Sequence, residues 1–227
     1  MKRKWTCLVR YVKGLFHPTP PPTNEKLELS VTSETPVTIH IRANAQEPLR
    51  QTEILTDVIQ RRSSYRSLGA ETPEMENVLH PYAVIVTQDC DLTQDFKARF
   101  GNAEQLNSTD KLIPNVLLAE AVSVAELIAN LPIKGKDIRK RVCQNKAERY
   151  HVFQKVEAAD DTLRSGLPPL GIDFKRYFTV PTDELYSQVN SSAKRRCHLN
   201  SPYLEHFGKR FADFLSRVAL PKDHEIE

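Results

Sequence analysis

The densest group of polar side chains with chemical potential lies at residues 87–95, which read TQDCDLTQD. This group follows residues 82–87, whose sequence YAVIVT predicts a buried strand. Asp89, Cys90 and Asp91 are the candidate catalytic residues, with Cys90 as a nucleophile or the aspartates as ligands of a hard cation. Neighbouring carboxylates oppose thiolate formation, and the spacing lacks the glycine and final glutamate of an EF-hand loop. A structural interpretation therefore stays open, in which the aspartates cap a turn and Cys90 fills a gap in the core.

His151 is a further candidate catalytic residue, because it lies in a predicted strand at residues 149–156 and an imidazole can act as a general base. A single histidine in a strand is also often structural.

The sequence lacks the recognised motifs for metal binding, redox chemistry and phosphate binding. The four cysteines are scattered without a C-x-x-C pair, which speaks against zinc and redox motifs and favours reduced thiols in a cytoplasmic protein. No glycine-rich phosphate-binding motif is present, so no cofactor and no metal is predicted.

Basic side chains, several of them next to tyrosines, form the second set of candidates. Eight basic residues and two acidic residues lie between Lys134 and Lys155, which gives this segment a charge of +6. Arginine pairs with phosphate and tyrosine stacks on bases, so this combination suits a nucleic-acid-binding face, although solvated surfaces also produce such runs. The predicted nucleic-acid-binding residues are Arg61, Arg62, Arg66, Arg139, Arg141, Arg149, Lys175 and Arg176.

The charge of the chain is unevenly distributed. The 227 residues carry a net charge of +3, but the first 16 residues hold five basic residues and no acidic one, so the remainder is slightly acidic. This balance excludes a protein that coats nucleic acid by charge alone. Residues 1–16 also alternate apolar and basic positions at helical spacing, which predicts peripheral membrane contact, docking on a partner, or a frayed tail. No apolar run approaches the length of a transmembrane helix.

The elements that must position these residues divide the chain into three parts. Residues 1–23 form the basic leader and a proline-rich linker, residues 24–47 a possible peripheral hairpin, and residues 48–221 the main domain. Short apolar strands are predicted at 82–87, 149–156 and 170–180, and a short apolar strand or a helical turn at 53–59. A polar loop is predicted at 61–77, and a strand leading into a helix at 112–125. Phenylalanines at helical spacing predict a core-facing helix between 201 and 221. The expected fold is α+β: a small antiparallel, partly closed β-barrel with a C-terminal amphipathic helix.

Three segments resemble the PemK/MazF-like group of SH3-like barrels. Thr52-Glu53-Ile54 stands where that group has Gly-Asp-Ile, HPYAVIVT at 80–87 is similar to its buried strand, and IDFKR at 172–176 is similar to its late strand. The resemblance implies an SH3-like barrel and RNA cleavage, with Arg61 or Arg62 in the role of the arginine after the first strand. The serine or threonine of that family's central strand has no counterpart here.

Three functions therefore remain open. The first is a non-catalytic module that binds nucleic acid (RNA or DNA) or a protein partner through an Arg/Tyr-rich face. The second is a toxin-like endoribonuclease on the same barrel. The third is a metal- or thiol-dependent site at Asp89-Cys90-Asp91.

Overall fold

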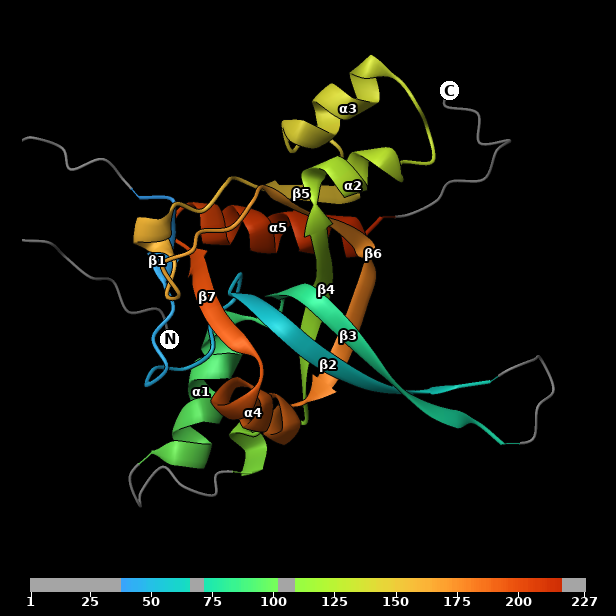
Figure 1. The fold of residues 1–227 in the computed structure, drawn as a ribbon. Helices are drawn as coiled ribbons and strands as arrows, with labels where there is room; N and C mark the ends of the chain where they lie inside the picture. Colours follow the sequence, from blue (N-terminus) through green and yellow to red (C-terminus); the bar gives the residue numbers. More distant parts are fainter. Residues whose placement is uncertain (1–37, 66–71, 102–108, 218–227) are drawn as a thin grey trace, which may run out of the picture. The chain divides into compact units, whose positions relative to one another are not determined.

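The computed structural model describes residues 38–65, 72–101 and 109–217 (Figure 1). The predicted leader and linker, the membrane-contacting segment 1–16, most of the 24–47 hairpin and Arg66 lie outside the described residues. The chain divides into residues 1–37 and residues 38–227, and all of the following concerns the second unit. Within its described part, no helix has both the length and the apolar character needed to cross a membrane.

The described unit is α+β and contains one seven-stranded antiparallel sheet with the strand order β1-β7-β2-β3-β4-β6-β5. This confirms the predicted α+β class and antiparallel arrangement. The partly closed barrel is not confirmed, because the hydrogen bonds among the described strands leave β1 and β5 as the two edges of an open sheet. The strands are β1 (His40–Arg42), β2 (Ile54–Ser64), β3 (Glu74–Ile85), β4 (Asn115–Ser123), β5 (Tyr150–Phe153), β6 (Leu170–Pro181) and β7 (Lys194–Leu199).

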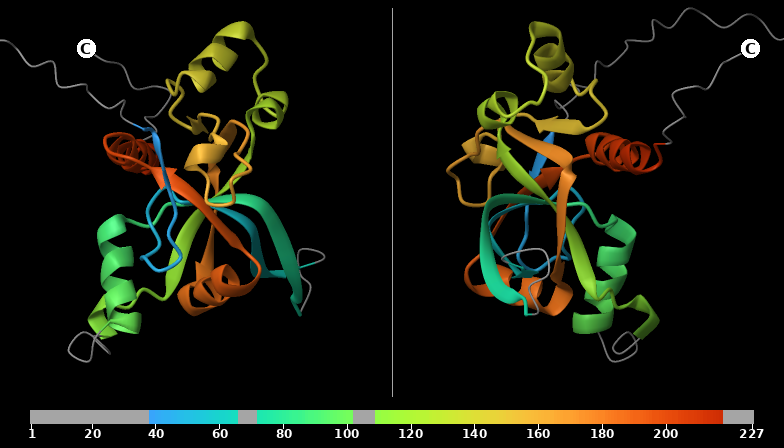
Figure 2. Two further views of the ribbon diagram at one scale, coloured as in Figure 1. Left: turned by 60° about the vertical axis from the view of Figure 1, so that its left-hand side comes forward. Right: turned by 90° about the vertical axis from the view of Figure 1, so that its right-hand side faces the viewer.

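Five α-helices occur among the described residues. Figures 1 and 2 show α2 and α3 at one end of the sheet and α1 and α4 at the other. The basic segment 133–144, which shows no strong periodicity in the sequence, contains one of these helices. They are α1 (Asp89–Phe100), α2 (Val124–Ala129), α3 (Lys136–Cys143), α4 (Thr182–Ser191) and α5 (Tyr203–Leu215), together with the short 3₁₀ segments at Thr109–Lys111 and Ala158–Asp160.

The β2–β3 hairpin is longer than the sequence predicts. A polar loop was expected over 61–77, but β2 continues to Ser64 and β3 begins at Glu74, with Arg61 paired to Asn77 and Arg62 to Glu76. That prediction is wrong for a physical reason. Beyond its buried half the hairpin projects from the sheet, as Figure 1 shows, so both of its faces meet solvent and the apolar alternation that marks a half-buried strand is lost.

A large β-bulge in β6 determines the geometry of the candidate site. On one side of the bulge Tyr177 pairs with Ala119 of β4, and on the other side Ile172 pairs with Ala121. Glu120 therefore lies opposite residues 173–176, which are the DFKR of the late-strand motif. Bulges bend a strand and redirect its side chains, and this one brings charged groups of β6 over the middle of β4.

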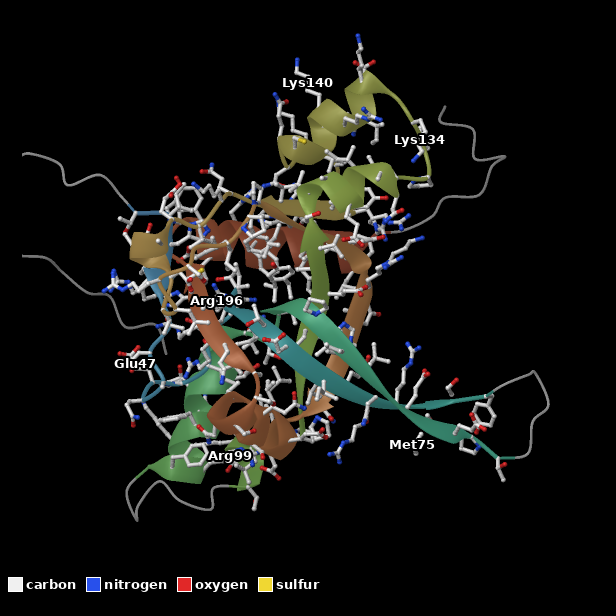
Figure 3. The ribbon with its side chains drawn as sticks, in the orientation of Figure 1. Glu47, Met75, Arg99, Lys134, Lys140 and Arg196 are labelled. Atoms are coloured by element: carbon white, nitrogen blue, oxygen red, sulfur yellow. The ribbon has the colours of Figure 1, made fainter. Side chains whose placement is uncertain are left out.

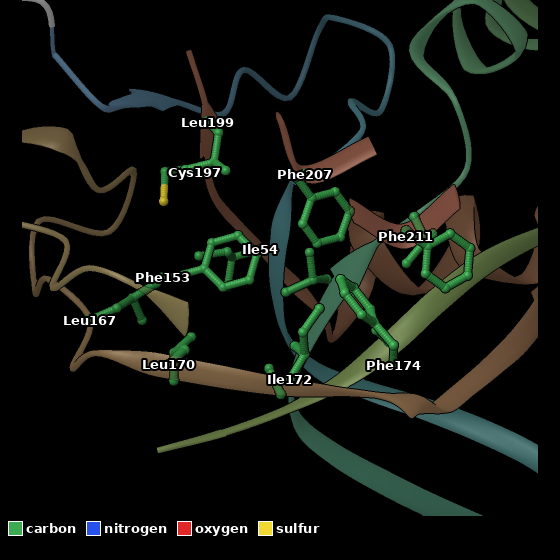
Figure 4. Close-up of a cluster of buried hydrophobic side chains, with 14 of the residues drawn as sticks. Ile54, Phe153, Leu167, Leu170, Ile172, Phe174, Cys197, Leu199, Phe207 and Phe211 are labelled. Atoms are coloured by element: carbon green, nitrogen blue, oxygen red, sulfur yellow. The ribbon is translucent and has the colours of Figure 1, made fainter. Parts of the chain in front are cut away.

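The sheet encloses two large clusters of buried apolar side chains. In the first cluster Phe207 and Phe211 of α5 pack on Phe174 with ring centroids 5.9 and 5.4 Å apart. Figure 4 shows this packing together with Ile172 and Phe153 from the sheet. The phenylalanine stripe of 201–221 thus faces the core in the described part of that segment, where Phe214 is also buried.

Strand β7 carries two consecutive buried arginines, Arg195 and Arg196. Arg195 donates a hydrogen bond of 2.9 Å to Glu53, and Arg196 donates one of 2.7 Å to Asp161 (Arg196 is labelled in Figure 3). Neither arginine is more than 9% exposed. Both are satisfied internally and are thereby excluded as contacts for a large partner.

Candidate functional site

The Asp89-Cys90-Asp91 group lies in the first turn of helix α1 and not in a loop. The Asp89 carboxylate accepts a 2.9 Å hydrogen bond from Arg50 Nε and a 2.7 Å bond from the Gln51 backbone N–H. Asp89 and Asp91 also stand at the positive end of the helix dipole, where carboxylates stabilise the helix. The two aspartates therefore have a structural task at the start of α1, as the structural interpretation expected. The other half of that interpretation is wrong, because Cys90 is exposed and does not fill a gap in the core.

Cys90 is exposed, and its sulfur lies 3.6 Å from the Gln88 side-chain oxygen and 3.6 Å from an Asp91 oxygen. Both neighbours are hydrogen-bond acceptors, and neither is a base that would deprotonate the thiol for nucleophilic attack. The third aspartate, Asp95, is fully buried and bound to Arg99. Among the described residues, no group of three or more histidine, cysteine, aspartate or glutamate side chains is placed to hold a metal ion.

His151 lies on β5 and is only 4% exposed, with its ring edge-on to Phe153 and Phe207. Burial, with contributions from the nearby Arg210 and His206, lowers its pKa to about 3. The imidazole is therefore neutral at pH 7. It lies apart from the Asp89 group, in a cavity described below.

The predicted nucleic-acid-binding residues are more informative, because the structure gathers three of them around Glu120 of β4. Two adjoining cavities, of about 90 and 250 Å³, share Glu120 and Arg176 in their walls. We refer to the two together as the Glu120 depression. Its remaining lining comes from β2, β3, the bulge of β6, β5 and α2: Gln60, Arg62, His80, Val122, Glu126, Leu127, Asn130, Arg149, Tyr150, Gly171, Asp173, Tyr177 and Phe178.

The smaller cavity contains an arginine fixed by a carboxylate. Arg149 Nε donates a 2.8 Å hydrogen bond to Asp173 Oδ1, and a second nitrogen of the same guanidinium pairs with the other oxygen. The guanidinium carbon lies 5.1 Å from the centroid of the Tyr150 ring, a cation–π distance. The hydrogen bond that Arg149 donates to Asp173 is the largest influence on the Arg149 pKa and raises it, so this cation is permanent.

The larger cavity contains a chain of polar side chains from adjacent strands. Arg176 lies 3.2 Å from one oxygen of Glu120, and His80 Nδ1 lies 3.8 Å from the other. The His80 ring stacks on Phe178 with centroids 3.9 Å apart, and its Nε2 lies 3.2 Å from Gln60. Burial lowers the His80 pKa, although the Glu120 charge acts in the opposite direction. An uncharged imidazole and a partly exposed carboxylate thus face each other beside the Arg176 guanidinium, whose side chain is 64% exposed.

The other predicted arginines occupy different positions. Arg62 lines the larger cavity and forms an ion pair with Glu76, whereas Arg61 points to Glu184 of α4 at 3.3 Å. Lys175 is exposed on the bulge beside Arg176. The arginines near the depression are therefore compensated by carboxylates, and the depression itself is close to electrically neutral.

Arg139 and Arg141 lie on α3, which is the uncompensated basic element. Its sequence KDIRKRVC has four cations and one acid, and the four cations are exposed without an ion-pair partner in the described part of the chain. Val142 of α3 packs in one cluster with Leu127 and Tyr150, both of which line the smaller cavity. Figure 3 shows Lys140 at the outer side of this helix. Helix α3 is thus fixed next to the Glu120 depression with its charges toward solvent.

Sequence reasoning missed Glu120 and His80 as site residues. Glu120 had a usable signal, since it is the one charged residue in the run VLLAEAVSV, where a carboxylate in a sheet must face a partner or a cavity. His80 stands two residues before the apolar run and carries no such signal. Its role depends on Phe178, which is 98 positions later in the sequence.

Comparison with known proteins adds no assignment: no protein-family model matches the chain, and no curated protein matches it either.

Proposed function

We propose that this protein binds single-stranded nucleic acid, with RNA as the first candidate, through the Glu120 depression and helix α3. The single observation that carries the proposal is the convergence of Arg149, Arg176 and the exposed ring of Tyr177 beside a helix whose cations have no ion-pair partner among the described residues, while the buried Tyr150 supports Arg149. Single strands are bound by this combination of stacking surfaces and a positive track for the backbone.

The two parts have different tasks in this proposal. The exposed cations of α3 contact phosphates and supply most of the affinity, because each neutralised phosphate releases counterions. The arginines of the depression are neutralised by Asp173 and Glu120, so they serve as fixed hydrogen-bond donors for base edges and ribose hydroxyls. The exposed cations of α3 favour a polyanionic ligand, which is why we place nucleic acid before a protein partner.

The experiment that tests the proposal measures the affinity of the full-length protein for labelled single-stranded RNA and DNA as a function of salt. One variant replaces the four cations of α3 by glutamine (Lys136, Arg139, Lys140 and Arg141). Its matched control replaces four exposed lysines outside the site by glutamine (Lys97, Lys111, Lys194 and Lys209). We expect the first variant to lose affinity and to bind with a flatter salt dependence, and the control to bind like the wild type. An equal loss of affinity in both variants would show that binding is a non-specific effect of charge. If the wild type bound neither RNA nor DNA at low salt, nucleic acid would be rejected as the ligand.

A second candidate function, RNA cleavage, is favoured by the relationship of Glu120 to Arg176 and Arg62. Transesterification requires a base for the ribose 2′-hydroxyl and cations around the phosphate. Glu120 would accept the 2′-hydroxyl proton as that oxygen attacks phosphorus, the P–O5′ bond would break, and the 5′ oxygen would take a proton from water. Arg62 follows the apolar half of β2 and lines the same cavity, as the PemK/MazF-like resemblance implies for its arginine.

The barrel that accompanies this resemblance also remains a proposal. Its support is the location of the three matching segments: 52–54 lies at the start of β2, 80–87 covers the buried end of β3, and 172–176 forms the bulge of β6. Glu120→Gln separates the two functions. Loss of RNA cleavage with retained binding supports the enzyme, whereas intact RNA after incubation with the wild type, with and without added Mg²⁺, supports the binding module alone.

The metal- or thiol-dependent site at Asp89-Cys90-Asp91 stands behind these two, because Asp89 is occupied by Arg50 and the backbone of Gln51. Cys90→Ala tests it directly. An effect of this substitution on RNA binding or cleavage would bring it forward.

A further inference from the structure

A separate cavity of about 220 Å³ lies on the other side of β5 from the Glu120 depression. Tyr150 lines the depression, and the next residue, His151, lines this cavity. Its walls are apolar, formed by Ile39, Val152, Phe153 and Leu199, and its polar rim consists of Gln144, Asn145, Gln154, Tyr203 and His206. We refer to it as the His151 cavity.

His151 is the unusual member of this lining. His151 is only 4% exposed, and its Nδ1 has no hydrogen-bond partner among the described residues. Leaving a buried polar nitrogen unpaired is destabilising, so such groups in native proteins call for an explanation. The ring is held by Phe153 and Phe207 and lies 6.1 Å, centroid to centroid, from the ring of His206. A ligand that reaches the floor of the cavity would meet this imidazole.

The charge and the size of the His151 cavity restrict the ligand. No carboxylate from the described residues lines it, and the first turn of α5, with Tyr203 and His206, forms part of its rim. A cationic ligand is therefore disfavoured. The volume is below the range of about 300–1,000 Å³ that holds a drug-sized molecule, which leaves room for one ring system. Apolar walls with amide, phenol and imidazole groups at the rim suit a flat, uncharged ring whose edge has both donors and acceptors.

A nucleobase has this chemistry, and the connection of the cavity to α3 makes it accessible to a bound strand. Gln144 directly follows α3, lines the cavity, and belongs to the turn that leads into β5. Asn145 clamps the end of β5 through two hydrogen bonds to the Val152 backbone, of 3.0 and 2.7 Å, so the polar rim is rigid. We propose that the His151 cavity takes one unstacked nucleobase of a single strand whose backbone lies along α3. This inference rests on the proposed nucleic-acid binding and adds base selectivity to it.

The test uses fluorescein-labelled octamers of rU, rC and rA and an abasic octamer, titrated into the full-length protein at constant salt, with free nucleosides as a second set of probes. His151→Phe keeps an aromatic ring in the core and removes both nitrogens. Tyr203→Ala changes the exposed rim and serves as a variant that cannot fail through the core. Phe100→Ala is the control for Tyr203→Ala, because Phe100 is an exposed aromatic residue that lines neither the Glu120 depression nor the His151 cavity.

We expect the wild type to prefer one base over the abasic strand by about tenfold. His151→Phe and Tyr203→Ala should abolish this preference while the affinity for the abasic strand stays unchanged. Preference retained in both variants, or binding of inorganic phosphate in place of nucleosides, would overturn the inference. The two proposals can fail separately. If the octamers do not bind but nucleosides bind in a way that depends on His151, the nucleic-acid function is rejected and the ligand site in the His151 cavity is kept. If the octamers bind without base preference, the nucleic-acid function is kept and the nucleobase site is rejected.

Discussion

Arg196 and Asp161 form a buried ion pair with two hydrogen bonds of 2.8 and 2.7 Å between the guanidinium and the carboxylate. Asp161 is completely buried and also accepts hydrogen bonds from the backbone N–H groups of Leu163, Ser165 and Gly166. One carboxylate thereby fastens the 161–166 turn to strand β7.

Asp161→Ala should lower the free energy of unfolding by about 3–5 kcal/mol, because it leaves the Arg196 charge buried without its partner. Urea unfolding followed by circular dichroism measures this loss. Asp213→Ala is the control. Its carboxylate pairs with Lys209 on the surface, where both side chains are more than half exposed, and its removal should cost less than about 1 kcal/mol. Equal costs for the two substitutions would show that the buried pair contributes no more than the surface pair.

The His151 ring predicts how stability depends on pH. Its pKa is about 3 in the folded protein, mainly through burial, against about 6.5 in the unfolded chain. The unfolded state therefore binds the proton first, so the stability contribution is complete above pH 6.5 and is lost as the pH falls toward 3. Between pH 6.5 and pH 5 the wild type should lose about 2 kcal/mol more than His151→Phe in urea unfolding. If the wild type and His151→Phe lost stability in parallel, the His151 ring would have to be in contact with water in the folded protein.

A side chain at Gly171 should force the Leu127 side chain to move. A Cβ atom there would lie 2.5 Å from Leu127 Cδ2, at the place where α2 crosses β6 beside the Glu120 depression. We expect Gly171→Ala to destabilise the protein by about 1–3 kcal/mol through overpacking, measured as a shift of the urea midpoint. Gly208→Ala is the control, since its Cβ would make only an ordinary 3.4 Å contact and alanine favours helix α5. A stable Gly171→Ala would mean that the Leu127 side chain has room to move.

Arg176→Ala should weaken RNA binding about tenfold, because the depression loses one of its hydrogen-bond donors and Glu120 loses its arginine partner. The salt dependence should change little, since Arg176 is compensated by Glu120 before binding. Fluorescence anisotropy at two salt concentrations measures both effects, and Lys155→Ala serves as the surface control. A tenfold loss accompanied by a flatter salt slope would instead identify Arg176 as a phosphate contact.

Local patterns in the sequence predicted the elements whose residues alternate between apolar and polar or form a continuous apolar run. They failed for elements whose structure depends on contacts with residues far away in the sequence. The buried run at 82–87 lies largely in β3, and 112–125 does contain a strand followed by a helix. Helix α1 was missed because Asp89, Cys90 and Asp91 resemble a polar loop, while the fit of Asp89 to Arg50 depends on residues 39 positions apart. Strand β7 was missed because its arginines are charged, and their burial depends on Glu53 and Asp161.

The candidate site shows the same division. Arg149 and Arg176 were recognised from their residue type and their tyrosine neighbours. Their grouping could not be predicted, because it depends on the bulge of β6, where one residue of β4 faces four of β6. The partners Glu120 and His80 come from other strands and are adjacent only in the folded sheet.

The projecting end of the β2–β3 hairpin also affects the tendency of the protein to self-associate. Beyond Ile59, whose backbone hydrogen-bonds to the Gln188 side chain of α4, each strand pairs only with the other among the described strands, and Met75 and Leu79 are exposed on this hairpin. Such a ribbon is a template for strand addition and aggregation, and charged side chains are a common means of preventing it. Arg61 and Arg62 lie on this ribbon. We expect these two charges also to oppose strand addition, so that their removal should promote self-association.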